Sequence, residues 1–427
     1  MTEVVITGLG LFSPLGIGRD TVTPRLMSGE TGIRKVERFH CAATPGNIGA
    51  EVVGWDEGEA KKTWLKPVRK SFKVMCREIQ IGVASAAAAA DDAGIIGTVE
   101  SERLGIDFGA NLMLTPPPEF SGPAEACKDE SGKFDFDAWG TKGYHVMEPL
   151  WLLKYLPNMP ACHICILADA RGPNNSLTQD EASSYLVMGE AKRVIERGWA
   201  DAMICGATGT RVHEMKAIHS RMWDKLGIDP EDLSESCRPF DKERNGEVVG
   251  EGAASFILES AEHAKSRGAN ILATVRGTSA VCVTDPEKGP DTQKALTLAM
   301  RAAIKDAGLT PDEIGYINAH GAGTVDEDAD EAAAIHDVFG SRGSEIPVTA
   351  LKSVFGNAGA SCGAIELAAT LLAAAEGKVP ATQGTEHVDP ALNLNIVTEP
   401  IDLPNKIVLS TSVTRLGQAS AVVIELA

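Results

Sequence analysis

Two stretches of the chain share one pattern, and together they decide the fold. The first joins AAAADDAGI (residues 87–95) to LGIDFGAN (residues 104–111), and the second joins MRAAIKDAGL (residues 300–309) to IGYINAHG (residues 314–321). Each is an alanine-rich helical segment that ends in Asp-Ala-Gly and leads into an apolar, strand-like run. Gly94 and Gly308 stand where a helix favours a left-handed residue after its last turn. The repetition predicts two similar α/β halves.

The rest of the chain continues the alternation of strand-like and helical segments. EVVITGLG (residues 3–10), DAMICGATG (residues 201–209) and KIVLSTSV (residues 406–413) are apolar runs of strand length. Such alternation predicts an α/β fold with helices packed on sheets. We expect one half over residues 1–255 and the other over 256–427. Around residues 113–158 the chain is rich in Pro, Gly and charge, which indicates a cap or excursion, or else disorder.

Composition restricts the classes of function. The 427 residues are 44% apolar, which is ample for a buried core, and the formal net charge is -19. This charge disfavours nucleic acid or an anionic membrane as a partner of the whole surface. Nine cysteines at irregular spacing indicate reduced thiols rather than a disulfide framework. We therefore expect a cytoplasmic protein with no membrane span.

One segment departs from the acidic balance. In KKTWLKPVRKSFKVMCR (residues 61–77) basic side chains crowd together: Lys61, Lys62, Lys66, Arg69, Lys70, Lys73 and Arg77. They form either a solvated surface or a docking site for an acidic partner.

Three small-residue loops carry the polar side chains that suggest chemistry. Glu181 stands at the mouth of a helix in SLTQDEASS (residues 176–184), and His320 follows a strand among glycines that let a ligand approach. Lys352 and Asn357 precede a helix whose first turn exposes unpaired N–H groups. Spacing alone does not name a reaction.

Five motifs, in order, give the chain a family resemblance. VVITGLGLFSPLG (residues 4–16), RGPNNSLTQDEASS (171–184), ESCRPFDKERNGEVVGEGAASFILE (235–259), YINAHGAGT (316–324) and KSVFGNAG (352–359) resemble motifs of the β-ketoacyl-acyl-carrier-protein synthases. These enzymes elongate acyl chains in fatty-acid and polyketide synthesis. The resemblance implies the thiolase fold, two pseudo-symmetric α/β halves in a five-layer arrangement, usually as a dimer.

The resemblance places Glu181 where the family has its nucleophilic cysteine. A thiolate at a helix N-terminus is a good nucleophile and stores an acyl chain as a thioester, whereas the acyl adduct of a carboxylate is a labile mixed anhydride. Ordinary condensation through a covalent acyl-enzyme is therefore not expected.

The other site residues follow the family more closely. His320 matches the first active-site histidine, Lys352 matches the lysine of the Lys-Ser motif, and Asn357 stands where elongating synthases have a second histidine. His320 and Asn357 could donate hydrogen bonds to an enolate oxygen, so decarboxylation of a malonyl unit is still a reaction that the site could support. Glu331 matches a family glutamate that we interpret as structural.

A second departure lies in STSVTRLGQASAV (residues 410–422), which resembles the loop that gates the acyl pocket. Arg415 stands in the position of the family's Phe, and Leu416 in that of the next Gly. Opposite charges in a shared pocket predict a Glu181–Arg415 ion pair that fills or re-purposes the acyl channel.

Two functions remain. In the first, the chain acts on carrier-bound acyl or malonyl groups, by decarboxylation or a Claisen-type step, with Glu181 as a base. In the second, it is a non-catalytic subunit like the chain-length factors, which pair with a cysteine-containing synthase. The resemblance implies acyl carrier protein as partner, docked at Lys66, Arg69, Lys70 and Lys73, and a homodimer or a heterodimer with a cysteine-containing homologue.

No metal or cofactor is expected. The pair Cys162 and Cys165 lies in an apolar run without a second cysteine pair, and the N-terminal Gly-Leu-Gly lacks a third glycine at dinucleotide spacing. Cys362 is an alternative nucleophile near Asn357, but a small core residue at a helix start is the simpler interpretation.

Overall fold

The computed structural model describes residues 2–40, 43–227, 233 and 236–427. Its principal strands are β1 (Val4–Ser13), β5 (Leu104–Ala110), β6 (Asn174–Leu177), β7 (Ala202–Thr210), β8 (Glu251–Ser260), β9 (Ala273–Cys282), β12 (Tyr316–Asn318), β13 (Pro347–Thr349), β15 (Asn395–Ile396), β17 (Ile407–Val413) and β18 (Gln418–Leu426). They form a mixed sheet in the order β15-β13-β12-β17-β18-β9-β1-β8-β7-β5-β6.

The sheet consists of two runs with the same topology. In the first, β1, β8 and β7 are antiparallel neighbours, and β5 and β6 continue parallel to β7. In the second, β9, β18 and β17 repeat the antiparallel part, and β12 and β13 the parallel part. The runs meet where β1 pairs with β9 at Val5 and Ile6. This repetition confirms the predicted pair of similar halves. The expected division between residues 255 and 256 falls within β8, which pairs with β1 and β7 of the first run.

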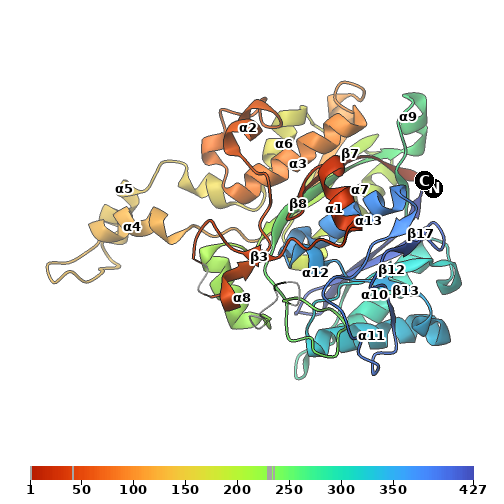
Figure 1. The fold of residues 1–427 in the computed structure, drawn as a ribbon. Helices are drawn as coiled ribbons and strands as arrows, with labels where there is room; N and C mark the ends of the chain where they lie inside the picture. Colours follow the sequence, from red (N-terminus) through yellow and green to blue (C-terminus); the bar gives the residue numbers. More distant parts are fainter. Residues whose placement is uncertain (1, 41–42, 228–232, 234–235) are drawn as a thin grey trace.

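Helices complete a five-layer arrangement. One outer layer contains α3 (Arg77–Ala93) and α6 (Met159–Ala168), and the other contains α10 (Thr292–Asp306) and α11 (Val325–Phe339). Between the two halves of the sheet lie α7 (Ser183–Glu196) and α13 (Cys362–Ala375), which share one hydrophobic core with residues of both. Figure 1 shows α7 and α13 in the middle of the body. Because α7 lies in this central layer, its N-terminus is close to both halves of the sheet.

The glycines of the N-terminal strand serve packing. A Cβ on Gly10 would lie 2.0 Å from the backbone oxygen of Ser85, and one on Gly8 would lie 2.4 Å from that of Ala89. The alanine-rich face of α3 therefore lies directly on β1, and glycine is required at the contact. Gly94 ends α3 in the left-handed conformation with φ 60°, as the sequence predicts.

The segment around residues 113–158 forms an arm. It contains α4 (Pro117–Ala126), a π-helical turn (Trp139–Gly143), α5 (Tyr144–Val146) and a 3-10 turn (Trp151–Tyr155). Aromatic rings pack within it, Phe120 against Trp139 and Trp151. Figure 1 shows α4 and α5 projecting from the body. The segment is thus an excursion with short helices of its own, and no residue of the arm lines the cavities around Glu181.

Candidate functional site

Glu181 lies at the junction of β6 and α7. A single 3-10 turn, η6 (Asp180–Ala182), connects them, and Asp180 in this turn adopts a left-handed φ of 45°. Aspartate is one of the few non-glycine residues that tolerate this conformation. The turn directs Glu181 inward, so that its side chain is only 8% exposed. A carboxylate at this depth needs hydrogen-bond donors, and other segments supply them.

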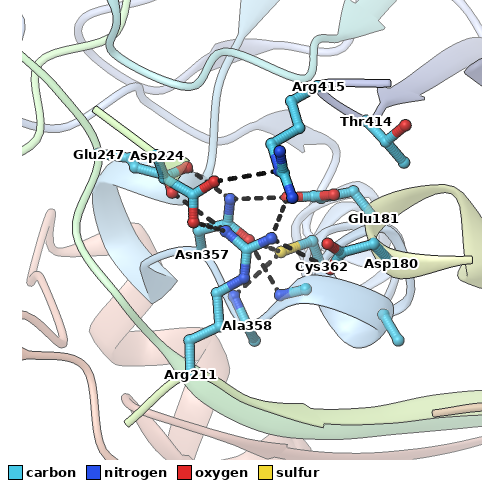
Figure 2. Close-up of polar contacts among 12 residues, drawn as sticks. Asp180, Glu181, Arg211, Asp224, Glu247, Asn357, Ala358, Cys362, Thr414 and Arg415 are labelled. Atoms are coloured by element: carbon cyan, nitrogen blue, oxygen red, sulfur yellow. Dashed lines mark hydrogen bonds and ion pairs between the residues drawn. The ribbon is translucent and has the colours of Figure 1, made fainter. Parts of the chain in front are cut away.

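Arg211, which follows β7, is the main partner of Glu181 (Figure 2). Its Nη2 lies 2.5 Å from Glu181 Oε1 and 3.0 Å from Asp180 Oδ1. Its Nη1 lies 3.0 Å from Glu247 Oε1 and 3.5 Å from Asp224 Oδ2. One buried guanidinium therefore binds carboxylates from three segments of the chain, and this ion cluster occupies the centre of the site.

The predicted Glu181–Arg415 ion pair is wrong. Arg415 instead places its Nε 3.6 Å from Asp224 Oδ1 and its guanidinium 5.4 Å from the centre of the Trp223 ring. Its side chain is 44% exposed, and the neighbouring Leu416 is exposed. Asp224 binds Arg415 at the rim because Arg211 already occupies the position beside Glu181.

Asn357 has every hydrogen-bonding group of its amide engaged. Nδ2 donates to Glu181 Oε1 at 3.1 Å and to Glu247 Oε2 at 2.5 Å. Oδ1 accepts from the backbone N–H of Gly359 at 2.9 Å and from the Cys362 thiol at 3.2 Å. A side-chain amide has two N–H donors, so Asn357 has none left for a ligand.

Burial dominates the electrostatics of the two glutamates. It raises the pKa of Glu181 to about 7, with Arg211 opposing the shift and Asp180 adding to it. It raises the pKa of Glu247 to about 8, again opposed by Arg211. Both groups therefore titrate near neutral pH, and the cluster holds protons that an exposed carboxylate would have released.

His320 and Lys352 form a second buried group. Lys352 Nζ donates to the backbone oxygen of His320 at 2.7 Å and to Glu366 Oε1 at 2.9 Å. Burial lowers the pKa of His320 well below its usual value, and the cations Lys352 and Arg211 lower it further. The Val413 N–H lies 3.4 Å from His320 Nδ1, which assigns the ring proton to Nε2. Glu331 accepts the backbone N–H groups of His320 and Gly321, so it holds the loop.

Two cavities adjoin the cluster. One of ≈ 230 Å³ has Glu181 and His320 in its wall, and one of ≈ 520 Å³ has Asp180 and Arg211 in its wall. Trp223, Asp224 and Arg415 belong to both walls. The Asp224–Arg415 pair therefore stands between them, and the sequence-derived site residues Glu181 and His320 share the smaller cavity.

The candidate thiols are not poised for chemistry. The Cys362 thiol is buried and donates to Asn357, and burial raises its pKa to about 12. Cys162 and Cys165 are half-buried on α6, where Asn174 Nδ2 lies 2.5 Å from Cys165 Sγ. Within the described ranges, no group of three or more His, Cys, Asp or Glu residues is arranged to hold a metal ion. No helix in those ranges is long and apolar enough to cross a membrane.

The basic segment presents its central cations to solvent. Lys66, Arg69, Lys70 and Lys73 are exposed, and the part of the chain that the structure describes offers them no ion pair. Arg77 differs, because its Nη2 binds the buried Glu251 at 2.6 Å. The exposed cationic surface therefore contains fewer residues than the basic cluster of residues 61–77 in the sequence.

Sequence reasoning missed three members of the site, Arg211, Asp224 and Glu247. Glu247 lies in the stretch ESCRPFDKERNGEVVGEGAASFILE, but charged residues are frequent there. Arg211 stands at the carboxyl end of an apolar strand, as His320 does. That position is the sequence feature from which Arg211 could have been predicted as a site residue.

Comparisons with known families match most of the chain. The model described as "Beta-ketoacyl synthase, N-terminal domain" matches residues 1–264, and "Beta-ketoacyl synthase, C-terminal domain" matches residues 272–386. The chain is 32% identical over 400 residues to the 3-oxoacyl-[acyl-carrier-protein] synthase 2 of Synechocystis sp., covering 92% of this chain and 91% of that protein. It is 31% identical over 400 residues to the same-named protein of Coxiella burnetii, with the same coverage.

Solved structures of similar architecture include a ketosynthase/chain length factor. The structure of the ishigamide ketosynthase/chain length factor has a TM-score of 0.86 and 26% identity, covering 100% of this chain and 99% of that one. A beta-ketoacyl synthase from Burkholderia phymatum has a TM-score of 0.85 and 26% identity, covering 100% of both chains. A type II PKS acyl-carrier protein in complex with its ketosynthase has a TM-score of 0.82 and 25% identity, covering 100% and 99%. The fold is that of the thiolase-type ketosynthases.

Proposed function

This chain is a member of the β-ketoacyl synthase family, and we propose that it is a subunit of fatty-acid or polyketide synthesis that forms no covalent acyl-enzyme. It would assist a cysteine-containing synthase, as a chain length factor does. The observation that carries this proposal is the bonding of Glu181, which the resemblance of the sequence motifs assigns to the position of the family's nucleophile. Its carboxylate is buried and held by Arg211 Nη2 at 2.5 Å and by Asn357 Nδ2 at 3.1 Å.

The donors that decarboxylation requires are committed elsewhere. A malonyl thioester loses CO2 when donors stabilise the enolate oxygen. Both protons of Asn357 Nδ2 are bound to carboxylates, those of Glu181 and Glu247. Freeing one breaks a hydrogen bond to a charged group, which costs about 1.5–3 kcal/mol. His320 Nε2 alone then faces the substrate, which favours the assisting role over a catalytic one.

The smaller cavity has the wrong charge for malonate. Even without Glu181 and Glu247, whose pKa values are raised to about 7 and about 8, its wall contains acidic residues in excess of cationic ones: Asp224, Asp326, Glu327 and Asp330 against Lys225 and Arg415. Both cations are already paired, Lys225 with Asp326 and Arg415 with Asp224. An anionic malonyl group would enter against this field.

The partners follow from the surface and from the relatives. Lys66, Arg69, Lys70 and Lys73 form an exposed cationic surface suited to an acidic acyl carrier protein. The similar ketosynthase/chain length factor supports pairing with a cysteine-containing homologue in place of a homodimer, and the similar ketosynthase complex supports a carrier protein. Arg415 and Leu416 would then shape the rim of the cavity without gating an acyl-enzyme.

A second candidate function is malonyl decarboxylation, in which the enolate left after loss of CO2 takes a proton from the protonated form of Glu181. One observation favours it, because Glu181 and His320 face the same cavity of ≈ 230 Å³ and the pKa of Glu181 is raised to about 7. An acid with such a pKa can donate a proton near neutral pH.

Co-expression with a cysteine-containing synthase distinguishes the two. We expect a stable heterodimer whose chain elongation stops when the partner's cysteine is replaced by alanine and continues when Glu181→Gln is introduced here. Release of acetyl-carrier protein from malonyl-carrier protein by this chain alone, lost in Glu181→Gln, would instead establish the decarboxylase.

A further inference from the structure

The cavity of ≈ 230 Å³ beside Glu181 has no ligand in the assisting role proposed above. Three of the segments that enclose it are the turn before α7 with Glu181, the loop after β12 with His320, and the first turns of α11. The exposed Trp223 also lies in its wall, so the cavity reaches the protein surface. A site for a single water needs about 10–15 Å³, so this cavity admits an organic molecule.

The α11 side of the cavity carries negative charge that no cation balances. Glu327 and Asp330 are three residues apart on α11 and so lie on one face of the helix. Among the residues that the structure describes, neither forms an ion pair, in contrast to Asp326, which pairs with Lys225. Burial raises the pKa of Asp330, and the nearby acids Asp291 and Asp326 raise it further. Such a wall favours a ligand that brings positive charge.

Glu181 and His320 each present one unpartnered polar atom to the same cavity. Arg211 and Asn357 both donate to Glu181 Oε1, and no other described residue donates to Oε2. His320 Nδ1 accepts from the Val413 N–H, and no residue in the described ranges accepts from Nε2. The Glu181 side chain is 8% exposed and His320 is 4% exposed. Unsatisfied polar atoms at this depth cost free energy, which a ligand hydroxyl would recover by accepting from Nε2 and donating to Oε2.

A metal ion does not fit this arrangement. Over the described ranges, no group of three or more His, Cys, Asp or Glu side chains is placed to hold one. The unpaired carboxylates and the unpartnered atoms therefore do not converge on a single point, whereas a chain molecule can span them. Primary amines are protonated at neutral pH, so an alkylammonium supplies the positive charge and its chain bridges the cavity.

We propose that this cavity binds a small amino alcohol. The ammonium group lies against Glu327 and Asp330, and the hydroxyl accepts from His320 Nε2 and donates to Glu181 Oε2. The complex is non-covalent and needs neither a carrier protein nor a partner subunit, so its test is separate from that of the assisting role.

Calorimetric titration of the full chain at neutral pH and low salt tests the proposal. The probes are the amino alcohols from 3-amino-1-propanol to 6-amino-1-hexanol, because the chain length must match the span of the cavity. The alkylamine, the alkanol and the hydroxycarboxylate of the same chain length supply the ammonium alone, the hydroxyl alone and the opposite charge. We expect saturable binding of at least one amino alcohol, with each control about tenfold weaker or more, equivalent to ~1.4 kcal/mol. No binding of any amino alcohol, or equal binding of any of the three controls, overturns the proposal.

Variants locate the ammonium group. Glu327→Gln with Asp330→Asn should weaken binding about tenfold or more, whereas Glu262→Gln with Asp312→Asn, at exposed acids outside the wall, should leave it unchanged. Lys225→Gln removes an exposed cation of the wall, and it should tighten binding about two- to threefold. Equal effects of the two double variants would mean that only net charge matters and would overturn the assignment. So would unchanged affinity in Lys225→Gln, a test that stays available if the double variant in α11 does not fold.

Discussion

Arg211 is the residue on which the site depends. Burying a guanidinium and several carboxylates costs desolvation free energy, and the mutual hydrogen bonds must offset it. Arg211 achieves this by donating to Glu181 and Asp180 from one nitrogen and to Glu247 from the other. Removing a partner from such a cluster costs more than the cluster contributes, because the remaining charges stay buried. Glu181 is therefore tied to the fold through Arg211.

Replacing Arg211 should destabilise the protein strongly. Arg211→Met leaves Glu181 and Glu247 buried without a cation, and we expect the free energy of unfolding to fall by about 3–5 kcal/mol. Urea denaturation monitored by circular dichroism measures this. Arg415→Met is the control, since Arg415 is half-exposed and lies 3.6 Å from Asp224, and it should cost less than about 1 kcal/mol. Equal effects of the two changes would contradict the central role of Arg211.

The pH dependence of stability should report Glu181 directly. Burial raises its folded pKa to about 7 from the ordinary 4.5, so the folded state binds the proton more tightly than the unfolded state. Stability from this group is then fully present below pH 4.5 and declines as the pH rises to about 7, by up to about 3 kcal/mol.

Glu181→Gln removes that dependence. Its unfolding free energy relative to wild type should rise by about 1–3 kcal/mol between pH 4.5 and 8, while the exposed control Glu399→Gln stays level with wild type. A constant difference between Glu181→Gln and wild type across that range would show that Glu181 is not the titrating group.

The sequence predicted which residues lie in the site better than it predicted which charged groups they contact. Glu181, His320 and Asn357 were found because each follows a small-residue loop at the end of a strand or the start of a helix. The ion pair to Arg415 was wrong because the choice among nearby charges depends on side-chain direction. Arg211 reaches Glu181 from the end of β7, and no local pattern distinguishes that arginine from any other.

Close packing of α3 on β1 fixes the first half of the fold. The backbone of α3 lies so near to β1 that Gly10 has no room for a methyl group, with Ser85 O at 2.0 Å from an added Cβ. Gly8 makes a similar contact, with Ala89 O at 2.4 Å from an added Cβ, and the second half repeats it, because a Cβ on Gly277 of β9 would lie 2.2 Å from Ala303 O of α10. Glycine is thus a packing residue at equivalent places in both halves.

A methyl group at this contact should be destabilising. Gly10→Ala forces the helix away from the sheet, and we expect a loss of about 1–3 kcal/mol or more, measured as a shift of the urea midpoint. Gly140→Ala is the control, because no atom lies within 4 Å of its added Cβ. If both variants unfold at the same denaturant concentration, the contact is not tight.

At the scale of elements, the repeated Asp-Ala-Gly pattern predicted both helices, their glycine ends and the strands after them. The division between residues 255 and 256 stays a prediction, and β8 continues through residue 255 as one buried strand. The sequence left the arm open between cap and disorder, because the aromatic contacts that order it, such as Phe120 with Trp151, join residues far apart in the segment.

As a whole molecule, the chain combines an acidic body with a small cationic surface. Lys66, Arg69, Lys70 and Lys73 are exposed and unpaired within the described residues. An acidic carrier protein would be attracted to this surface over the distance that salt permits, about 10 Å at 0.1 M ionic strength. Such a surface fits the proposed subunit, which would still meet carrier proteins.

Charge reversal at this surface should weaken carrier binding. Lys70→Glu with Lys73→Glu should reduce affinity about tenfold at low salt, and the difference from wild type should shrink as salt rises. Lys294→Glu with Lys305→Glu, on the exposed face of α10, changes the net charge equally and should leave most of the affinity intact. Surface plasmon resonance across a salt series measures both, and equal losses would mean that only net charge matters.

The central claim is that Glu181, sealed by Arg211 and Asn357, keeps this chain from carrying an acyl group. Intact-mass spectrometry after incubation with hexanoyl- and malonyl-carrier protein, with a cysteine-containing synthase as positive control, tests it most directly. The account predicts an unchanged mass for this chain and an acyl adduct on the control synthase. A retained acyl adduct on this chain, at Cys362 or at any other residue, would contradict it.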